Sequence, residues 1–256
     1  MTTNVSDFYR PQRTRNLFNP ESPEAYRISR NKIELFQDCP RCFYLDRRKG
    51  VGRINPPGYS LNSAVDTLLK KEFDVHRAAG TPHPLMRRYG IDAVPFAHDR
   101  LEEWRDALRG GVTHLHGATN LLVTGGIDDA WKSGRGWIHV VDYKSTSKKD
   151  EPTLDAPWQI GYKRQAEIYQ WLFERNGFDV EPVAYFVYCN GQTDREAFDA
   201  RLEFDVTVLP YTGDWSWVDG AMHGIKACLM SDNVPPAAES CDWCAYRAAV
   251  SAHLQD

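Results

Sequence analysis

The two ends of this chain carry matching cysteine pairs, and these pairs constrain the fold more than any other feature. Cys39 and Cys42 form one Cys-x-x-Cys pair, and Cys241 and Cys244 form another near the opposite end. Four thiolates brought together suit either one tetrahedral Zn²⁺ ion or a four-iron cluster. Either centre would join the two ends of the fold and close a long loop. The alternative is two unrelated pairs of packed thiols.

Length and composition favour an ordinary globular chain with a real core. The 256 residues are 42% hydrophobic and 26% charged, which suits one substantial domain. No apolar stretch approaches the roughly 20 residues of a membrane span, and the polar N-terminus lacks the apolar segment of a signal peptide. We therefore expect a cytoplasmic protein. The net charge of −4 excludes a bulk basic surface, so a nucleic-acid partner would need positive charge concentrated locally.

Helical patterns dominate the first part of the chain. Residues 1–27 are polar and are expected to form an N-terminal arm. Ser29 can cap a helix that Pro40 interrupts. The apolar spacing from Leu61 to Phe73 predicts a second helix, within a helical subdomain over residues 58–111.

The periodicity then changes to that of strands. Residues 112–144 predict strands with a hairpin loop at "KSGRG", and residues 155–177 predict the clearest helix. Two further strands follow, with "NG" at 190–191 as a turn signal, and the C-terminal part returns to helix. We expect an α/β or α+β fold, with a mixed central sheet flanked by helices and a catalytic sheet core over residues 112–210.

Two aspartates and a lysine lie at the ends of adjoining predicted strands. If Trp131 lies opposite Trp137, then Asp128 lies opposite Val140 and on the same face as Asp142 and Lys144. Two carboxylates so close repel unless a hard cation such as Mg²⁺ lies between them. A slip of one residue would turn Asp128 to the other face, and Asp129 would then take its place.

Three short motifs together resemble those of the PD-(D/E)XK nuclease superfamily, in its RecB-like branch with the CRISPR-associated exonucleases. They are "GGIDDAW", the strand "HVVDYKS" and the helix segment "YKRQAEIYQ", in which Gln165 and Tyr169 share one face. An earlier helix of that branch carries a metal-binding histidine. Here "LNSAVDTLLK" places Asp66 at that position, which is a departure from the pattern.

The resemblance implies a restriction-endonuclease-like core and a metal-dependent DNA nuclease. Asp128 and Asp142 would bind Mg²⁺ or Mn²⁺, helped by the backbone carbonyl of Tyr143 and by Asp66. Lys144 would orient or deprotonate the attacking water and stabilise the charge of the transition state. Gln165 and Tyr169 would position the scissile phosphate or the strand.

The resemblance also favours a [4Fe–4S] cluster at the four cysteines, with zinc as the alternative. Members of the branch usually draw three ligands from the C-terminal side, whereas here Val250 stands where a third would fall and Cys42 appears in compensation. We expect one nuclease-like domain over residues 28–256, with the cysteine segments 39–42 and 241–244 joining its ends. The expected substrate is single-stranded or end-containing DNA. The rival hypotheses are a catalytically silent nuclease fold that binds DNA or a protein, and a zinc-stapled structural protein.

Overall fold

The computed structural model describes residues 12–54 and 58–254 and separates into two compact units. Of the described residues, unit 1 comprises 12–54, Leu115–Val123 and 217–254, and unit 2 comprises Gly58–His114 and Thr124–Ser216. The single domain expected over residues 28–256 stays a prediction.

Unit 2 is built on a mixed sheet of five strands in the order β2-β5-β6-β7-β8. Strands β6 and β7 are parallel and the other neighbours are antiparallel, which confirms the expected mixed sheet. The strands are β2 (Ala93–Pro95), β5 (Asp129–Ser133), β6 (Ile138–Thr146), β7 (Val183–Gly191) and β8 (Phe204–Thr212). Its helices are α3 (Ser60–Ala79), α4 (Pro84–Arg88), α5 (Leu101–Arg105) and α6 (Ile160–Arg175), the last preceded by a 3₁₀ turn over Pro157–Gln159.

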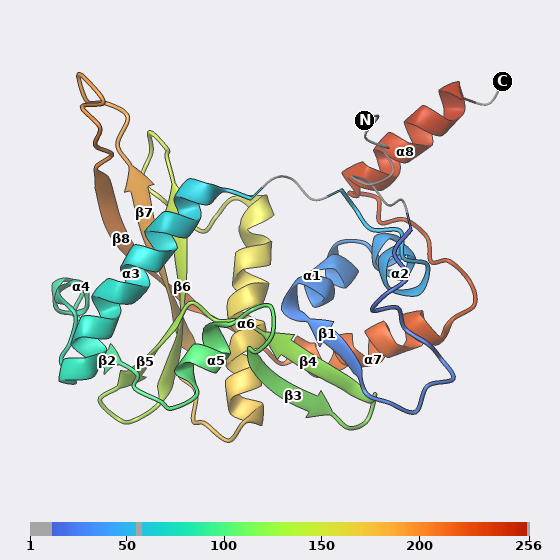
Figure 1. Cartoon of the computed structure of the whole chain (residues 1–256), viewed down its shortest axis with the longest axis horizontal. Coiled ribbons are helices and arrows are strands. Elements are labelled where there is room, and N and C mark those ends of the chain that lie inside the picture. The colour runs from blue at the N-terminus through green and yellow to red at the C-terminus, as the bar shows by residue number, and fades with distance from the viewer. Residues whose placement is uncertain (1–11, 55–57, 255–256) are drawn as a thin grey trace, which may run out of the picture. The chain divides into compact units, whose positions relative to one another are not determined.

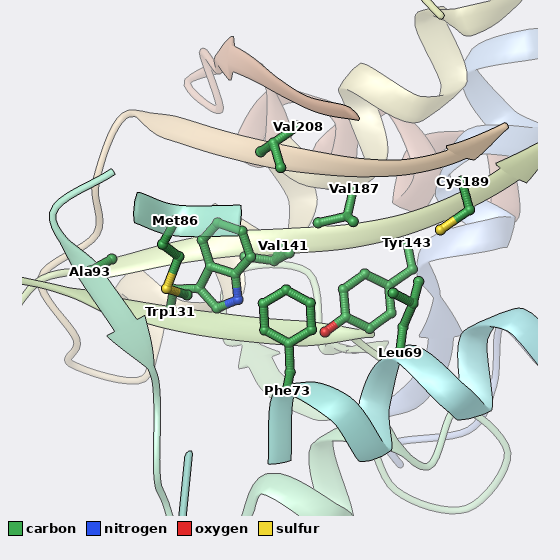
Figure 2. Close-up of a cluster of buried hydrophobic side chains, with 10 residues drawn as sticks. All are labelled: Leu69, Phe73, Met86, Ala93, Trp131, Val141, Tyr143, Val187, Cys189 and Val208. Atoms are coloured by element: carbon green, nitrogen blue, oxygen red, sulfur yellow. The ribbon is translucent and has the colours of Figure 1, made fainter. Parts of the chain in front are cut away.

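Helices α3 and α6 both contact β6, and Figure 1 shows this strand between them. Side chains alternate along a strand, so one set of β6 residues meets each helix. Val141 and Tyr143 pack with Leu69 and Phe73 of α3 in the core cluster drawn in Figure 2. The alternate set, which includes Lys144, meets α6.

The hairpin between β5 and β6 corrects the predicted register. Trp131 pairs with His139, not with Trp137. The loop closes through a hydrogen bond from the Ser133 N–H to the Trp137 carbonyl, and Gly136 occupies the left-handed region at φ 89°. Short hairpin loops with a left-handed glycine are common and shift the pairing relative to a simple two-residue turn. The error is two residues, and an even shift leaves every side chain on its predicted face.

Two predicted boundaries also change. The range 58–111 is not wholly helical, because β2 within it adds an edge strand to the sheet. Residues 190–191, expected as a turn, are the last of β7, and the connection to β8 follows them.

Unit 1 contains the two termini of the described chain. Its helices are α1 (Arg30–Asp38), α2 (Pro40–Arg48), α7 (Trp217–Met230) and α8 (Asp242–His253). Strand β1 (Tyr26–Ser29) belongs to a sheet of order β1-β4-β3, whose other strands are β3 (Val112–His116) and β4 (Leu121–Gly125). Ser29 does precede α1, but its side chain makes no capping hydrogen bond. Pro40 ends α1 as expected and also begins α2, where a missing N–H costs nothing.

The described part of the predicted arm is packed onto α2. Arg13 donates from Nη1 to Oδ1 of Asp46 at 2.8 Å, and its N–H donates to the Gly50 carbonyl. Phe18 is buried. Residues 12–27 are therefore not a loose tail, whereas residues 1–11 of the arm lie outside the described residues. Among the described helices, none has the length and apolar character needed to cross a membrane.

Candidate active site and cysteine centre

Asp142 and Lys144 lie together near the carboxyl end of β6. The Asp142 side chain is only 1% exposed, and the Lys144 amine makes an ion pair with its Oδ2. Within the described residues neither Asp142 oxygen accepts a hydrogen bond. Burial of a carboxylate without hydrogen-bond donors is costly unless cations surround it. The position therefore suits positive charge beyond the single lysine.

Asp128 immediately precedes β5 and faces Asp142. Continuing the observed register by one residue places Asp128 opposite Asp142, and its Oδ2 accepts the Tyr143 N–H at 2.8 Å. Burial raises the pKa of Asp128 to about 6, and the Asp142 charge adds to the rise, against the opposing influence of Lys70 and Lys144. A carboxyl held so close to a second one gains from a cation that both can bind.

Asp66 is linked to Asp128 through Lys70, a residue to which the sequence motifs assign no role. The Lys70 amine lies 2.9 Å from Asp66 Oδ2 and 3.7 Å from Asp128 Oδ1. Asp66 and Lys70 are one turn apart on α3, and this spacing was the available signal. The structure thus gathers three acids and two amines from α3, β6 and the segment before β5.

Gln165 and Tyr169 connect α6 to this group by a chain of hydrogen bonds. The Lys144 amine donates to Gln165 Oε1 at 3.3 Å, and Gln165 Nε2 donates to the Tyr169 hydroxyl at 3.3 Å. Tyr169 is buried and donates its hydroxyl hydrogen to the Gly126 carbonyl at 2.6 Å. These contacts link Lys144 and the segment before Asp128 to α6. The expected role of Gln165 and Tyr169 in positioning the scissile phosphate or the strand stays a prediction.

The glycine before Gly126 makes room for this tyrosine. A Cβ on Gly125 would lie 2.5 Å from Tyr169 Cε1, well inside any allowed contact. The "GG" of the predicted motif thus allows the helix to approach the strand that leads to Asp128.

Asp129, the substitute for Asp128 considered from the sequence, lies on the opposite face of the sheet from Asp128, among core side chains. Its Oδ1 accepts from Arg77 at 2.5 Å, and its Oδ2 accepts the Tyr143 hydroxyl at 2.7 Å. Arg105 lies 3.4 Å from the same carboxylate. Asp129 is therefore fully occupied in the core, which leaves Asp128 as the partner of Asp142.

The donor set fits a hard divalent cation. Mg²⁺ and Mn²⁺ accept carboxylate oxygens and can complete their coordination with waters, so Asp128 and Asp142 suffice as anchors. The Asp66 carboxylate does not lie close enough to those of Asp128 and Asp142 for the three to form one compact set of ligand atoms. Among the described residues only the four cysteines bring three or more potential ligand atoms within 4.8 Å of one another.

The four cysteines meet in unit 1. Cys42 Sγ lies 3.6 Å from Cys241 Sγ and 3.7 Å from Cys244 Sγ, and Cys39 Sγ lies 3.8 Å from Cys244 Sγ. Burial opposes ionisation of Cys39, but the N–H groups of Ala238 and Cys42 and the neighbouring thiols lower its pKa to about 6. The predicted cysteine cluster is confirmed as a set of four facing thiols.

A mixed sheet with paired acids and a lysine at adjoining strand ends defines a nuclease-type fold. The chain matches the family model of the PD-(D/E)XK nuclease superfamily over residues 60–249, so it belongs to that superfamily. The superfamily generally comprises metal-dependent nucleases, which act on nucleic acid. The resemblance to the superfamily that the three motifs indicated is thereby confirmed, and the RecB-like branch stays a prediction.

Two further comparisons, with solved structures and with curated proteins, add nothing to the family assignment. The solved structure titled "Crystal structure of SSO0001" is 14% identical, covers 92% of this chain and 90% of its own, and has a TM-score of 0.39. A search of curated proteins found no match to this chain.

Proposed function

We propose that the protein is a Mg²⁺- or Mn²⁺-dependent deoxyribonuclease that hydrolyses phosphodiester bonds in single-stranded or end-containing DNA. Such an exonuclease-type activity would serve repair, recombination or defence. The observation that supports it most is Asp142, which is buried, accepts no hydrogen bond among the described residues, and lies against Lys144 and opposite Asp128.

The chemistry divides between a bound cation and the side chains. The cation would supply a water of lowered pKa and neutralise charge on the phosphoryl oxygens. Asp128 and Asp142 would hold it, with the Tyr143 carbonyl and Asp66 as further oxygen donors. Lys144 would orient the attacking water and donate to a phosphoryl oxygen, where charge develops in the transition state.

The surrounding contacts fix these groups before substrate arrives. Gln165 restrains the Lys144 amine, and the Tyr143 N–H restrains the Asp128 carboxylate. Restraint of this kind lowers the reorganisation that the reaction would otherwise require. Gln165 and Tyr169 thus support the site by orienting its side chains.

The direct test is cleavage of labelled single- and double-stranded DNA with and without Mn²⁺. Lys144→Ala should abolish cutting while the circular dichroism spectrum stays unchanged. Lys132→Ala, which changes an exposed lysine of β5, is the matched control and should cut at the wild-type rate. Undiminished cutting by Lys144→Ala would refute the assignment. A wild-type protein that binds DNA but never cuts it would favour the silent binding module.

For the cysteine centre we infer one structural Zn²⁺ ion in preference to the [4Fe–4S] cluster. Zinc–sulfur bonds of about 2.3 Å in a tetrahedron place the sulfurs about 3.8 Å apart. Three of the Sγ–Sγ separations are 3.6, 3.7 and 3.8 Å, and all four Sγ atoms lie within 4.8 Å of one another. A four-iron cube carries its thiolates on separate corners and holds them much further apart. The spacing therefore supports a single ion.

Metal analysis of anaerobically purified protein tests this inference. One zinc per chain in a colourless preparation is the expected result. A brown protein with about four irons per chain would overturn it and restore the cluster.

A further inference from the structure

An exposed indole lies beside the candidate active site on a firmly held turn. Trp158 is 58% exposed and belongs to the 3₁₀ turn that precedes α6. The next residue, Gln159, is fully buried and donates to the Thr153 carbonyl at 2.6 Å and to the Tyr188 hydroxyl at 3.2 Å. The buried Gln159 side chain therefore anchors the turn to the protein, while the Trp158 indole next to it is exposed to solvent.

A line of aromatic and cationic groups leads from this indole to the catalytic lysine. The Trp158 and Tyr162 rings meet edge to face with centroids 5.4 Å apart. The Lys144 amine lies 4.3 Å from the Tyr162 centroid, and the Lys148 amine lies 5.2 Å from the Trp158 centroid. Tyr162 precedes Gln165 by three residues on α6, so both residues face β6.

Charge alone does not explain the exposed ring. The segment between β6 and α6 carries Lys148 and Lys149, but also Asp150, Glu151 and Asp155. These charges nearly cancel, so the segment offers a phosphate backbone little net attraction. What it does offer is an aromatic face, and nucleobases stack on such faces with little dependence on their sequence.

We propose that Trp158 and Tyr162 form a base-stacking subsite for an unpaired segment of the DNA, next to the phosphate that Lys144 serves. This subsite rests on the proposed nuclease function and adds the group that selects single strands. Bases inside a duplex are already stacked on both faces, so an unpaired base can cover the indole whereas an internal base pair cannot. Stacking there would place the adjoining phosphate toward Lys144.

Binding without cutting tests the subsite. Labelled oligothymidylate, an abasic oligomer of the same length and a blunt duplex are titrated by fluorescence anisotropy in EDTA. Trp158→Ala should weaken oligothymidylate binding by about 5- to 150-fold, the range for loss of one stacked base. Trp158→Phe should restore most of the affinity, because a flat ring remains. Binding of the abasic oligomer should not change.

Tyr89→Ala is the matched control, because Tyr89 is also an exposed aromatic with a cation, Arg88, over its ring at 5.8 Å. It precedes β2, which pairs with the hairpin end of β5, far along the sheet from Lys144. This variant should bind like wild type. Equal binding by Trp158→Ala and wild type, or an equal loss on the abasic oligomer, would overturn the subsite.

Cleavage by wild type separates the two proposals. If wild type cuts DNA but Trp158→Ala binds oligothymidylate normally, the subsite fails and the nuclease function stands. If Trp158→Ala loses base-dependent binding but wild type never cuts, the subsite stands and the nuclease function fails.

Discussion

Tyr169 donates its hydroxyl hydrogen to the carbonyl oxygen of Gly126 across 2.6 Å. This bond joins α6 to the backbone two residues before Asp128, which faces Asp142. A contact so placed controls where one of the two paired acids lies. The i, i+4 spacing of Gln165 and Tyr169 lets both side chains reach from one face of α6, Gln165 to Lys144 and Tyr169 to this segment.

Tyr169→Phe should impair metal binding more than it impairs folding. The change leaves the carbonyl of the half-buried Gly126 without its donor, at a cost of about 1–3 kcal/mol. Groups that orient metal ligands typically contribute 10- to 100-fold in affinity or activity. We expect a loss of that size in Mn²⁺ affinity, measured by titration calorimetry, and in the cleavage rate.

Tyr211→Phe provides the matched control. It also removes a hydroxyl, here that of a half-buried tyrosine, that is hydrogen-bonded to α6, in this case to Glu167. A comparable loss of melting temperature with normal Mn²⁺ affinity is expected. If both variants lower Mn²⁺ affinity alike, the Tyr169 hydroxyl has no special relation to Asp128.

Lys70 should affect metal binding and cleavage in opposite directions. Its amine lies 3.7 Å from Asp128 Oδ1, so it competes with a cation for that carboxylate. A unit charge at about 4 Å contributes about 1 kcal/mol even with water-like screening. Lys70→Met should therefore tighten Mn²⁺ binding several-fold in calorimetry. Cleavage should slow, because a positive charge near the phosphate is lost.

Lys71→Met is the control for Lys70→Met, and it tests whether any lysine-to-methionine change on α3 alters Mn²⁺ affinity and the cleavage rate. Lys71 is the exposed neighbour of Lys70 and should change neither quantity. Weaker Mn²⁺ binding by Lys70→Met would show that the lysine organises the acids and does not compete for them.

The sequence predicted the parts of the site that depend on alternation and failed where turn geometry or three-dimensional neighbours decide. Asp128, Asp142 and Lys144 fall on one face because strand periodicity survives an even error in register. The error itself came from the loop, since pairing depends on the left-handed conformation of Gly136. No local pattern could show that Tyr169 contacts Gly126.

Two other contributors were not identified for a similar reason. Lys70 ends the quoted segment "LNSAVDTLLK", where its spacing from Asp66 was the available signal, and Trp158 lies outside the three motifs. The significance of both comes from neighbours distant in the chain. Asp128 and Asp129 are adjacent and chemically alike, and only the packing of Arg77 and Tyr143 assigns Asp129 to the core. Fold class was accessible because it needs only the order and type of elements.

Asp128→Asn and Asp129→Asn should differ sharply in metal-free protein. The Asp128 pKa is raised from 3.8 to about 6, so its contribution to stability is greatest below pH 3.8 and is lost as the pH rises through about 6. Asp128→Asn removes that loss. Relative to wild type it should gain up to about 3 kcal/mol between pH 4 and pH 7, as two pKa units imply, while it no longer binds Mn²⁺.

Asp129→Asn should instead lose stability at neutral pH. It removes the charge that pairs with Arg77 and Arg105, and breaking a buried ion pair costs about 3–5 kcal/mol. Denaturant unfolding in EDTA at several pH values measures both variants. Matching pH profiles for the two would mean that the two carboxylates do not have the distinct positions described.

Arg53 should stabilise the metal at the cysteine centre. Its Nη2 lies 3.4 Å from Cys241 Sγ, and its Nη1 lies 3.2 Å from Asp38. Four thiolates around Zn²⁺ leave a net charge of about −2, which a neighbouring guanidinium partly neutralises. Arg53→Gln should weaken zinc binding about 10- to 100-fold in competition with a chelator, and Arg53→Lys should recover part of the loss because the charge remains.

Arg48→Gln is the matched control, because it removes another arginine of unit 1, one that pairs with the exposed Asp232 at 3.6 Å. This variant should release zinc at the same chelator concentration as wild type. Equal zinc retention by Arg53→Gln and wild type would show that the thiolates hold the ion without help from this charge.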